Sequence, residues 1–415
     1  MPSIAMVYKI GLGPSSSHTM GPANAAHWIK KHFPKALKYK VILYGSLALT
    51  GKGHFTDVAI KSVLGNDVEI VFDIKTKKIP HPNTMDFIVV EHNDLVIKKR
   101  IFSIGGGVIQ FEGEKVEEVN GPTIYYVQHA TTILEYCHNH HLSLIDFIKK
   151  HETTKFWDKL NHVWETMQKS IELGLSATDV LPGKLKLERS APKLILNKKK
   201  AHKTNYHIDN IDLMAYAYAV GETNASCKTV VTAPTCGAAG VLPAVLFYAF
   251  KKHRISTQQI LNALAIAGLI ANITRTNATI AGAEGGCQAE IGVACSMASA
   301  AYTYLLGGTN EQIFTAASIG MQHCIGLTCD PVLGYVQIPC IERNAVYACR
   351  AIDSANLAMS LTTKRLFNFD DDLDNMHDVG KSMKAKYRET SKGGLSRIYN
   401  HKIKTKAKVT SFDCK

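Results

Sequence analysis

The chain reads Leu327-Thr328-Cys329-Asp330-Pro331 and, shortly after, Ile338-Pro339-Cys340-Ile341-Glu342-Arg343-Asn344, with a third cysteine earlier in Glu284-Gly285-Gly286-Cys287-Gln288. No Cys-x-x-Cys pair is present among these stretches, so neither the usual zinc-finger nor the ferredoxin spacing applies. Each cysteine lies close to Gly or Pro, where a loop commonly turns into a helix and the helix dipole favours a thiolate. On spacing alone, three buried small hydrophobic residues are the commoner explanation. The alternative is a metal site with three thiolates and one position open to a substrate.

The sequence around these cysteines is alanine-rich and helical in pattern. Ser256-Thr257-Gln258-Gln259 and Thr309-Asn310-Glu311-Gln312 each place a Ser or Thr three residues before Gln, which is the capping-box signature of a helix start. Gly307-Gly308 predicts the end of the preceding helix. Many small residues permit close helix approach, as in a compact bundle around a buried cofactor. We therefore expect residues 204–415 to form an all-helical domain.

The first part of the chain alternates short β-rich segments with turns. Residues 56–64 and about 131–175 carry apolar residues at helical spacing, and the lysine-rich stretch 182–203 is the candidate linker. The fold class is therefore α+β, with a mixed α/β domain at 1–150, a helical connection and linker at 151–203, and the all-α domain at 204–415. The expected strands of the mixed sheet are 39–44, 68–72, 87–90, 95–103 and 108–111.

Composition narrows the class of protein. The 415 residues exceed the size at which one core stops growing, so two domains are expected. The longest apolar runs are too short to span a membrane, and no secretory signal is visible, so we expect a cytoplasmic protein without a membrane partner. Ten cysteines in such a chain indicate free thiols and metal ligands. The net charge of +13 is concentrated in lysine-rich segments without interleaved aromatic residues, so it predicts solvated surface and no nucleic-acid partner.

Two segments of the first domain offer groups for acid–base chemistry. Gly13-Pro14-Ser15-Ser16-Ser17-His18-Thr19 supplies hydroxyls and turn amides that suit an amino-acid substrate, although its Ser and Thr residues would also cap the helix that follows. Gly51-Lys52-Gly53-His54 follows an expected strand and presents a histidine on a loop, where it could be exposed or could face a cleft. Histidine titrates close to neutral pH, and we prefer His54 to His18 as a general base.

Together these motifs resemble the iron–sulfur-dependent L-serine dehydratases of bacteria. The resemblance covers nearly the whole chain in one order, and several long motifs carry it. They are residues 11–22, Leu43-Tyr44-Gly45-Ser46-Leu47-Ala48-Leu49-Thr50-Gly51-Lys52-Gly53-His54, Ser103-Ile104-Gly105-Gly106-Gly107, Ala233-Pro234-Thr235-Cys236-Gly237-Ala238-Ala239-Gly240, residues 282–298, residues 326–331 and residues 339–345.

The resemblance implies a single-chain lyase that converts L-serine to pyruvate and ammonia, with an N-terminal β-type domain and a helical cluster domain. It implies that Cys287, Cys329 and Cys340 hold a [4Fe–4S] cluster whose open iron acts as a Lewis acid on the leaving hydroxyl. It also implies a histidine base at His54 or His18. Ser15, Ser16, Ser17 and Thr19 are the expected substrate contacts.

Some features remain open at this point. Cys414 lies one residue from the C-terminus and is either an inert thiol or the resting ligand of the open iron. Cys236, Cys324 and Leu333 depart from the residues usual in the family, so extra sulfur is expected near the site. A homodimer is expected because it is common among soluble enzymes.

Two other functions fit parts of the sequence. A pyridoxal-phosphate dehydratase would need a Schiff-base lysine, and no lysine lies in a recognisable context for one. An amino-acid-binding regulatory protein would use the cysteines for structural zinc, and metal analysis separates it from the cluster enzyme.

Overall fold

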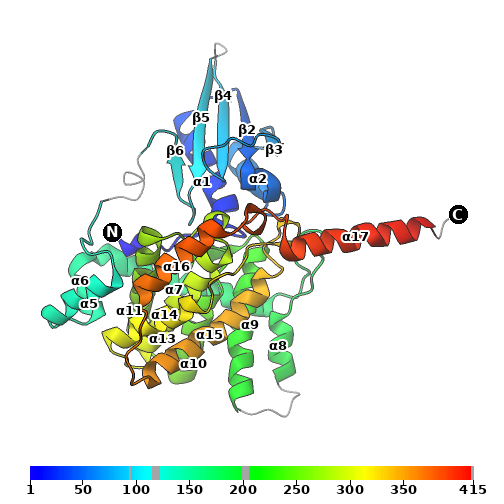
Figure 1. The fold of residues 1–415 in the computed structure, drawn as a ribbon. Helices are drawn as coiled ribbons and strands as arrows, with labels where there is room; N and C mark the ends of the chain where they lie inside the picture. The colour runs from blue at the N-terminus through cyan, green and yellow to red at the C-terminus, as the bar shows by residue number, and fades with distance from the viewer. Residues whose placement is uncertain (93–94, 115–121, 199–204, 413–415) are drawn as a thin grey trace.

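The computed structural model describes residues 1–92, 95–114, 122–198 and 205–412. A small mixed sheet with its helices stands on top of a larger helical body (Figure 1). This arrangement confirms the predicted α+β class and the order of its two parts. In the part of the chain that the structure describes, no helix is both long enough and apolar enough to cross a membrane.

The sheet has five strands in the order β3-β2-β4-β5-β6. Strand β2 runs parallel to β3, and the other neighbours are antiparallel. Apolar side chains of the strands pack against α1 and α3, which leaves one sheet face covered by helices. The elements are α1 (Gly21–His32), β2 (Lys38–Tyr44), α2 (Gly45–Thr50), α3 (Thr56–Leu64), β3 (Glu69–Asp73), β4 (Thr84–Val90), β5 (Val96–Ser103) and β6 (Ile109–Phe111).

The helical body is built around α13, an apolar and almost fully buried helix. Its neighbours α10, α11, α14 and α15 pack around it through small residues, as the alanine pattern predicts. The helices are α5 (Ala130–Asn139), α6 (Leu144–His151), α7 (Thr154–Ser176), α8 (Ala191–Lys198), α9 (Asn205–Ala225), α10 (Val241–His253), α11 (Thr257–Asn277), α12 (Gly282–Gly285), α13 (Ile291–Leu305), α14 (Asn310–Gln322), α15 (Cys340–Ser360), α16 (Phe369–Ser382) and α17 (Gly394–Phe412).

The N-terminal segment connects the helical body to the sheet. The short strand β1 (Ile10–Leu12) pairs antiparallel with β7 (Thr229–Val231) of the helical body. Between β1 and α1 lies the five-residue helix η2 (Ser16–Met20). The chain therefore enters the helical body first, passes through η2, and only then builds the sheet.

Local sequence signals account for many of the boundaries. Both predicted capping boxes are present, at Ser256 before α11 and at Thr309 before α14. The predicted linker differs, because residues 191–198 of it form α8, which packs beside α9. The predicted domain boundary at residue 150 stays a prediction, although side chains of α5 and α6 belong to the hydrophobic core of the helical body.

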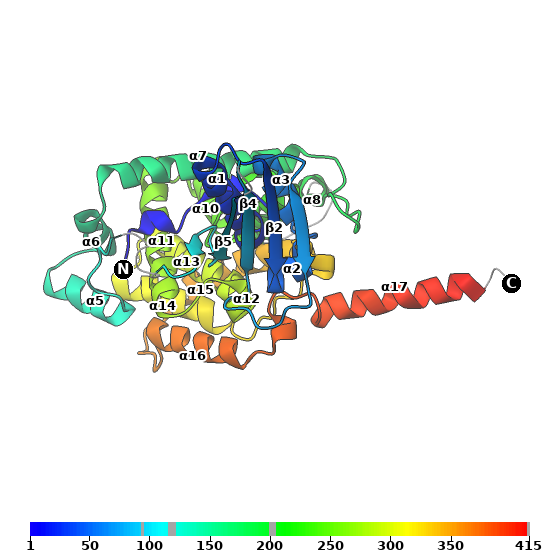
Figure 2. The same ribbon diagram turned by 90° about the horizontal axis from the view of Figure 1, so that it is seen from above.

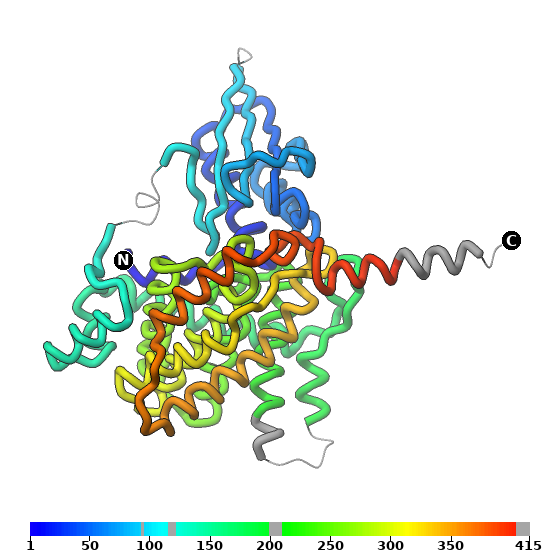
Figure 3. Tube along the Cα trace, in the orientation of Figure 1, coloured from blue at the N-terminus to red at the C-terminus, as the bar shows by residue number. Residues whose placement is uncertain are grey.

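The same trace drawn as a tube shows how the chain returns to the sheet at its end (Figure 3). After α16 the segment 383–393 passes beneath the sheet, and α17 then extends away from the body. This segment, which we call the strap (residues 383–393), brings the C-terminal part of the chain against α2 and the helical body. It is hydrogen-bonded to both, since the Ser46 hydroxyl of α2 donates to the Glu389 carbonyl and the Cys329 amide donates to the Tyr387 carbonyl.

Candidate active site

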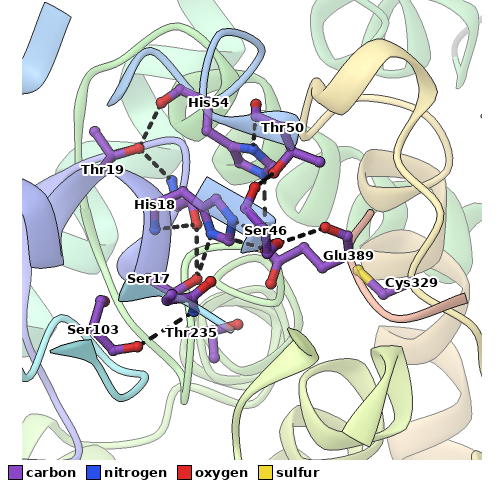
Figure 4. A network of polar contacts seen from close by, with 12 residues as sticks. Ser17, His18, Thr19, Ser46, Thr50, His54, Ser103, Thr235, Cys329 and Glu389 are labelled. Carbon is purple, nitrogen blue, oxygen red and sulfur yellow. Dashed lines mark hydrogen bonds and ion pairs between the residues drawn. The ribbon is translucent and has the colours of Figure 1, made fainter. Parts of the chain in front are cut away.

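His18 and His54 lie together beneath the sheet, although 36 positions separate them in the sequence. Their rings stack with centroids 4.5 Å apart, and both side chains are fully buried. His18 comes from η2 and His54 from the turn that follows α2 (Figure 4). The structure therefore brings both candidate bases into one site.

The turn that carries His54 approaches the helical body closely. A Cβ atom on Gly53 would lie 2.5 Å from the carbonyl oxygen of Leu333, so only glycine permits this backbone contact. The adjacent Thr19 hydroxyl donates a 2.7 Å hydrogen bond to the His54 carbonyl. Both contacts fix the position from which the imidazole is presented.

The His54 ring is oriented by one backbone hydrogen bond. Nδ1 lies 3.0 Å from the Thr50 carbonyl oxygen, which can only accept, so Nδ1 carries the proton. Nε2 of the neutral ring then holds the lone pair and faces Glu389 Oε1 at 3.8 Å. Burial lowers the pKa of His54 to about 4, so the ring is neutral and basic at Nε2 near pH 7.

His18 is oriented by a second chain of hydrogen bonds. The Ser46 hydroxyl donates to the Glu389 carbonyl at 2.7 Å, so its oxygen accepts from His18 Nε2 at 2.9 Å. Nδ1 faces the Ser17 hydroxyl at 2.9 Å and Glu389 Oε1 at 3.3 Å. Both ring nitrogens of His18 are therefore engaged, whereas the one hydrogen bond of His54 leaves its Nε2 directed into the site.

Glu389 completes this group, and the sequence analysis missed it. It lies on the strap with φ of 55°, and its amide donates a 2.8 Å hydrogen bond to the Cys329 carbonyl. The ligand atoms of His18, His54 and Glu389 all lie within 4.8 Å of one another, a donor set that suits a metal ion or a shared proton. Burial raises the pKa of Glu389 well above its usual value. No local pattern in the sequence marks this glutamate, because its role depends on the path of the strap.

The serine-rich loop supports the histidines. The Ser15 hydroxyl accepts a 3.0 Å hydrogen bond from the His18 amide and caps η2, whereas α1, the helix that these residues were predicted to cap, has Met20 as its N-cap and no side-chain cap. The Ser17 and Thr19 hydroxyls bond His18 and the His54 carbonyl. Ser16 is buried in the same turn. The hydroxyls expected to contact substrate therefore also hold the two imidazoles in place.

The motif cysteines lie near Glu389, whose charge raises the pKa of both Cys329 and Cys340. Cys287 begins a 3-10 helix and Cys340 begins α15, as expected, whereas Cys329 lies in a loop that bridges to Arg388 of the strap. Burial raises the pKa of all three thiols, and for Cys329 and Cys340 the neighbouring thiols raise it further. The effect of Cys287 on both other thiols indicates that the three sulfurs lie close enough to interact electrostatically.

Two charged side chains border the thiols. The Arg343 guanidinium hydrogen-bonds Cys287 and lowers its pKa, in opposition to burial. Glu290 accepts a hydrogen bond of 2.7 Å from the Thr235 hydroxyl and one of 3.8 Å from the Cys329 sulfur. Burial raises the pKa of Glu290 above its usual value. Neither residue received a role from the sequence, although both lie inside quoted motifs.

Three further cysteines were considered in the sequence or lie near the motif thiols. Cys287 is close enough to Cys324 to raise the pKa of the Cys324 thiol. Cys324 also hydrogen-bonds Cys295. Cys236 contacts the sulfur of Met20 at 3.9 Å. Cys414 lies outside the described residues, so its predicted role stays a prediction.

Several buried polar atoms around the site have no hydrogen-bond partner among the described residues. They include Ser103 Oγ and Glu389 Oε2 (both residues are labelled in Figure 4), and Ser103 is fully buried, with its backbone carbonyl accepting a 3.3 Å hydrogen bond from the Asn83 side-chain amide. Such atoms are costly in a folded protein unless a ligand or water satisfies them. Glu389 Oε2 is the one of these atoms that belongs to the histidine group, where a ligand or a water could satisfy it.

The low pKa of His54 predicts how stability changes with pH. His54 has an ordinary pKa of 6.5 when unfolded and about 4 when folded, so acid protonates the unfolded chain first. The contribution of His54 to the free energy of unfolding is therefore complete above pH 6.5. It decreases by about 3 kcal/mol as the pH falls to 4. We expect urea unfolding to show that the free energy of unfolding decreases by about 3 kcal/mol more in the wild type than in His54→Asn between pH 6.5 and pH 4. Parallel pH profiles of the two proteins would contradict the assignment.

The fold and site define a two-domain enzyme in which buried histidines and a carboxylate face three clustered thiols. The sequence matches the family described as serine dehydratase alpha chain over residues 89–396 and the serine dehydratase beta chain over residues 3–68. The chain belongs to the serine dehydratase family and is therefore a lyase, as the resemblance implies.

Named relatives agree along nearly their full length. The chain is 38% identical to L-serine dehydratase 1 of Escherichia coli, over 95% of this chain and 99% of that protein. It is 36% identical to L-serine dehydratase of Haemophilus influenzae, again over 95% and 99%. It is 32% identical to L-serine dehydratase of Streptomyces coelicolor, over 95% and 98%.

Proposed function

We propose that the protein is an L-serine dehydratase that converts L-serine to pyruvate and ammonia. One observation carries the proposal: Glu389 and Cys329 join the histidine pair to the three thiols through a single hydrogen-bonded strap. The proposed proton acceptor and the proposed cofactor ligands thereby belong to one connected set of contacts. The names of the relatives supply the substrate class.

The thiols fit a cluster better than a single ion. Among the described residues, Cys287, Cys329 and Cys340 do not form a group with all ligand atoms within 4.8 Å, whereas His18, His54 and Glu389 do. Three thiolates that share one zinc would lie closer than this, because Zn–S bonds are about 2.3 Å. The spread of the sulfurs and the cation of Arg343 beside them support a [4Fe–4S] cluster held by these three residues. When bound, such a cluster supplies a Lewis acid that makes the hydroxyl of serine a better leaving group.

The histidines would perform the proton chemistry. We propose that Nε2 of His54 removes the Cα proton, because it is neutral, buried and directed into the site. His18 would hold Glu389 and the serine loop in position rather than act as the base. Loss of the proton and of the hydroxyl leaves aminoacrylate, whose imine form reacts with water to give pyruvate and ammonia.

The substrate would lie between the two histidines and the three motif cysteines. Ser15, Ser16, Ser17 and Thr19 remain the proposed contacts, together with the unpartnered Ser103 Oγ. Since three of the loop hydroxyls already bond within the chain, substrate would exchange these hydrogen bonds rather than add new ones. A homodimer in the cytoplasm remains the expected form of the enzyme.

Anaerobic purification tests the proposal. We expect about four iron and four sulfide per chain and pyruvate formation from L-serine that is lost in air. Activity that survives prolonged oxygen and chelator would contradict the cluster. One zinc per chain, with no pyruvate formed, would support the regulatory alternative.

A further inference from the structure

A second cavity lies on the other side of the serine loop. Its volume is about 480 Å³, and none of His18, His54, Glu389 or the three motif cysteines lines it. Its walls come from the β1 region, α1, α3 and α7, and the three helices lie along the same edge of the molecule in Figure 2. It therefore lies at the junction of the two domains, beside the candidate active site, and shares only Thr19 with the proposed substrate contacts.

Most of the wall is apolar. The side chains of Leu12 and Val58 are 54% and 57% exposed, which is unusual for residues that border a closed core. An aliphatic ligand in this cavity would remove their apolar surface from water. The apolar lining residues include Ile10, Leu12, Met20, Phe55, Val58 and Val63.

Two ammonium groups, Lys9 and Lys159, lie in the same lining. The Lys9 backbone is held by Thr232, whose hydroxyl accepts from the Lys9 amide at 2.9 Å. Within the described residues, Lys9 Nζ contacts the Met6 sulfur at 3.9 Å and has no carboxylate at ion-pair distance. Burial, then Lys159 and Arg275, lower the pKa of Lys9 to about 8.

Lys159 Nζ donates to the Ala5 carbonyl, and the charge of Glu152 raises its pKa in opposition to burial, but neither lysine has a carboxylate at ion-pair distance among the described residues. Partly buried cations without an ion-pair partner beside an apolar wall suit one ligand chemistry. A carboxylate would relieve the repulsion between the lysines, and an aliphatic body would cover the apolar wall. L-serine lacks such a body. We propose that this cavity binds a small aliphatic carboxylate, with its charge at Lys9 and Lys159 and its chain against the apolar wall.

Titration calorimetry with sodium hexanoate on the full-length protein tests the proposal. Lys9→Met keeps the length of the side chain and removes its charge, so we expect the Kd for hexanoate to rise by about 10–100-fold. Lys159→Met is the second variant, and its Kd for hexanoate tests the proposal if Lys9→Met does not fold. Lys169→Met is the matched control, because Lys169 is exposed on the same helix as Lys159.

Different outcomes separate this site from the active site. We expect an unchanged hexanoate Kd in Lys169→Met and in saturating L-serine, and no binding of hexylamine. Equal hexanoate binding in all lysine variants, binding of hexylamine as tight as hexanoate, or competitive displacement by L-serine would overturn the proposal. Calorimetry does not depend on turnover, so the measured Kd for hexanoate can be interpreted even if the protein proves not to be a serine dehydratase.

Discussion

Replacing His54 by Asn is expected to lower kcat for L-serine by about 10²–10⁴-fold, which is the usual contribution of a positioned base. The Asn amide can still donate to the Thr50 carbonyl, as Nδ1 does now at 3.0 Å, so the turn should keep its conformation. What the variant removes is the lone pair of Nε2. Initial-rate measurements of pyruvate formation under anaerobic conditions give kcat and KM.

Controls assign that effect to the base. His138→Asn changes an exposed histidine of α5 and should leave kcat unchanged. His18→Gln keeps a donor near Ser46 and should lower kcat less than His54→Asn does. Iron content should be equal in all three variants. A His54→Asn enzyme within tenfold of the wild type, or a larger loss in His18→Gln, would transfer the role of base away from His54.

Replacing Cys340 by Ser is expected to remove most of the bound iron and to lower activity by more than about 100-fold, since even the supporting residues of metal ligands commonly contribute 10–100-fold. Serine is close to cysteine in size, so α15 should still begin at residue 340. Iron and sulfide analysis and the visible absorption of the anaerobic protein measure the loss directly.

Cys349→Ser is the matched control for this experiment. Cys349 lies on the same helix and is half-buried, but no motif cysteine contributes to the shift of its pKa. We expect its iron content and activity to equal those of the wild type. If Cys340→Ser retained as much iron as Cys349→Ser, Cys340 would not be a ligand.

Short-range patterns in the sequence predicted the elements of the fold well. The capping boxes at Ser256 and Thr309 mark helix starts because a side chain can reach an amide only three residues away. The five predicted sheet segments correspond to β2 to β6, since alternation reflects which face of a strand is covered. The linker prediction was incomplete for a related reason: α8 is stabilised by packing beside α9, which polar composition does not reveal.

The sequence by itself determined the local elements, the motif cysteines and the two histidines worth testing. Only the tertiary structure decided which of these groups meet, and it added Glu389, Glu290 and Ser46. The hydrogen bond from Ser46 to Glu389 joins residues 343 positions apart. No local propensity encodes such a contact, because it forms only when the strap closes over both domains and the burial of many side chains offsets the entropy of closing so long a loop.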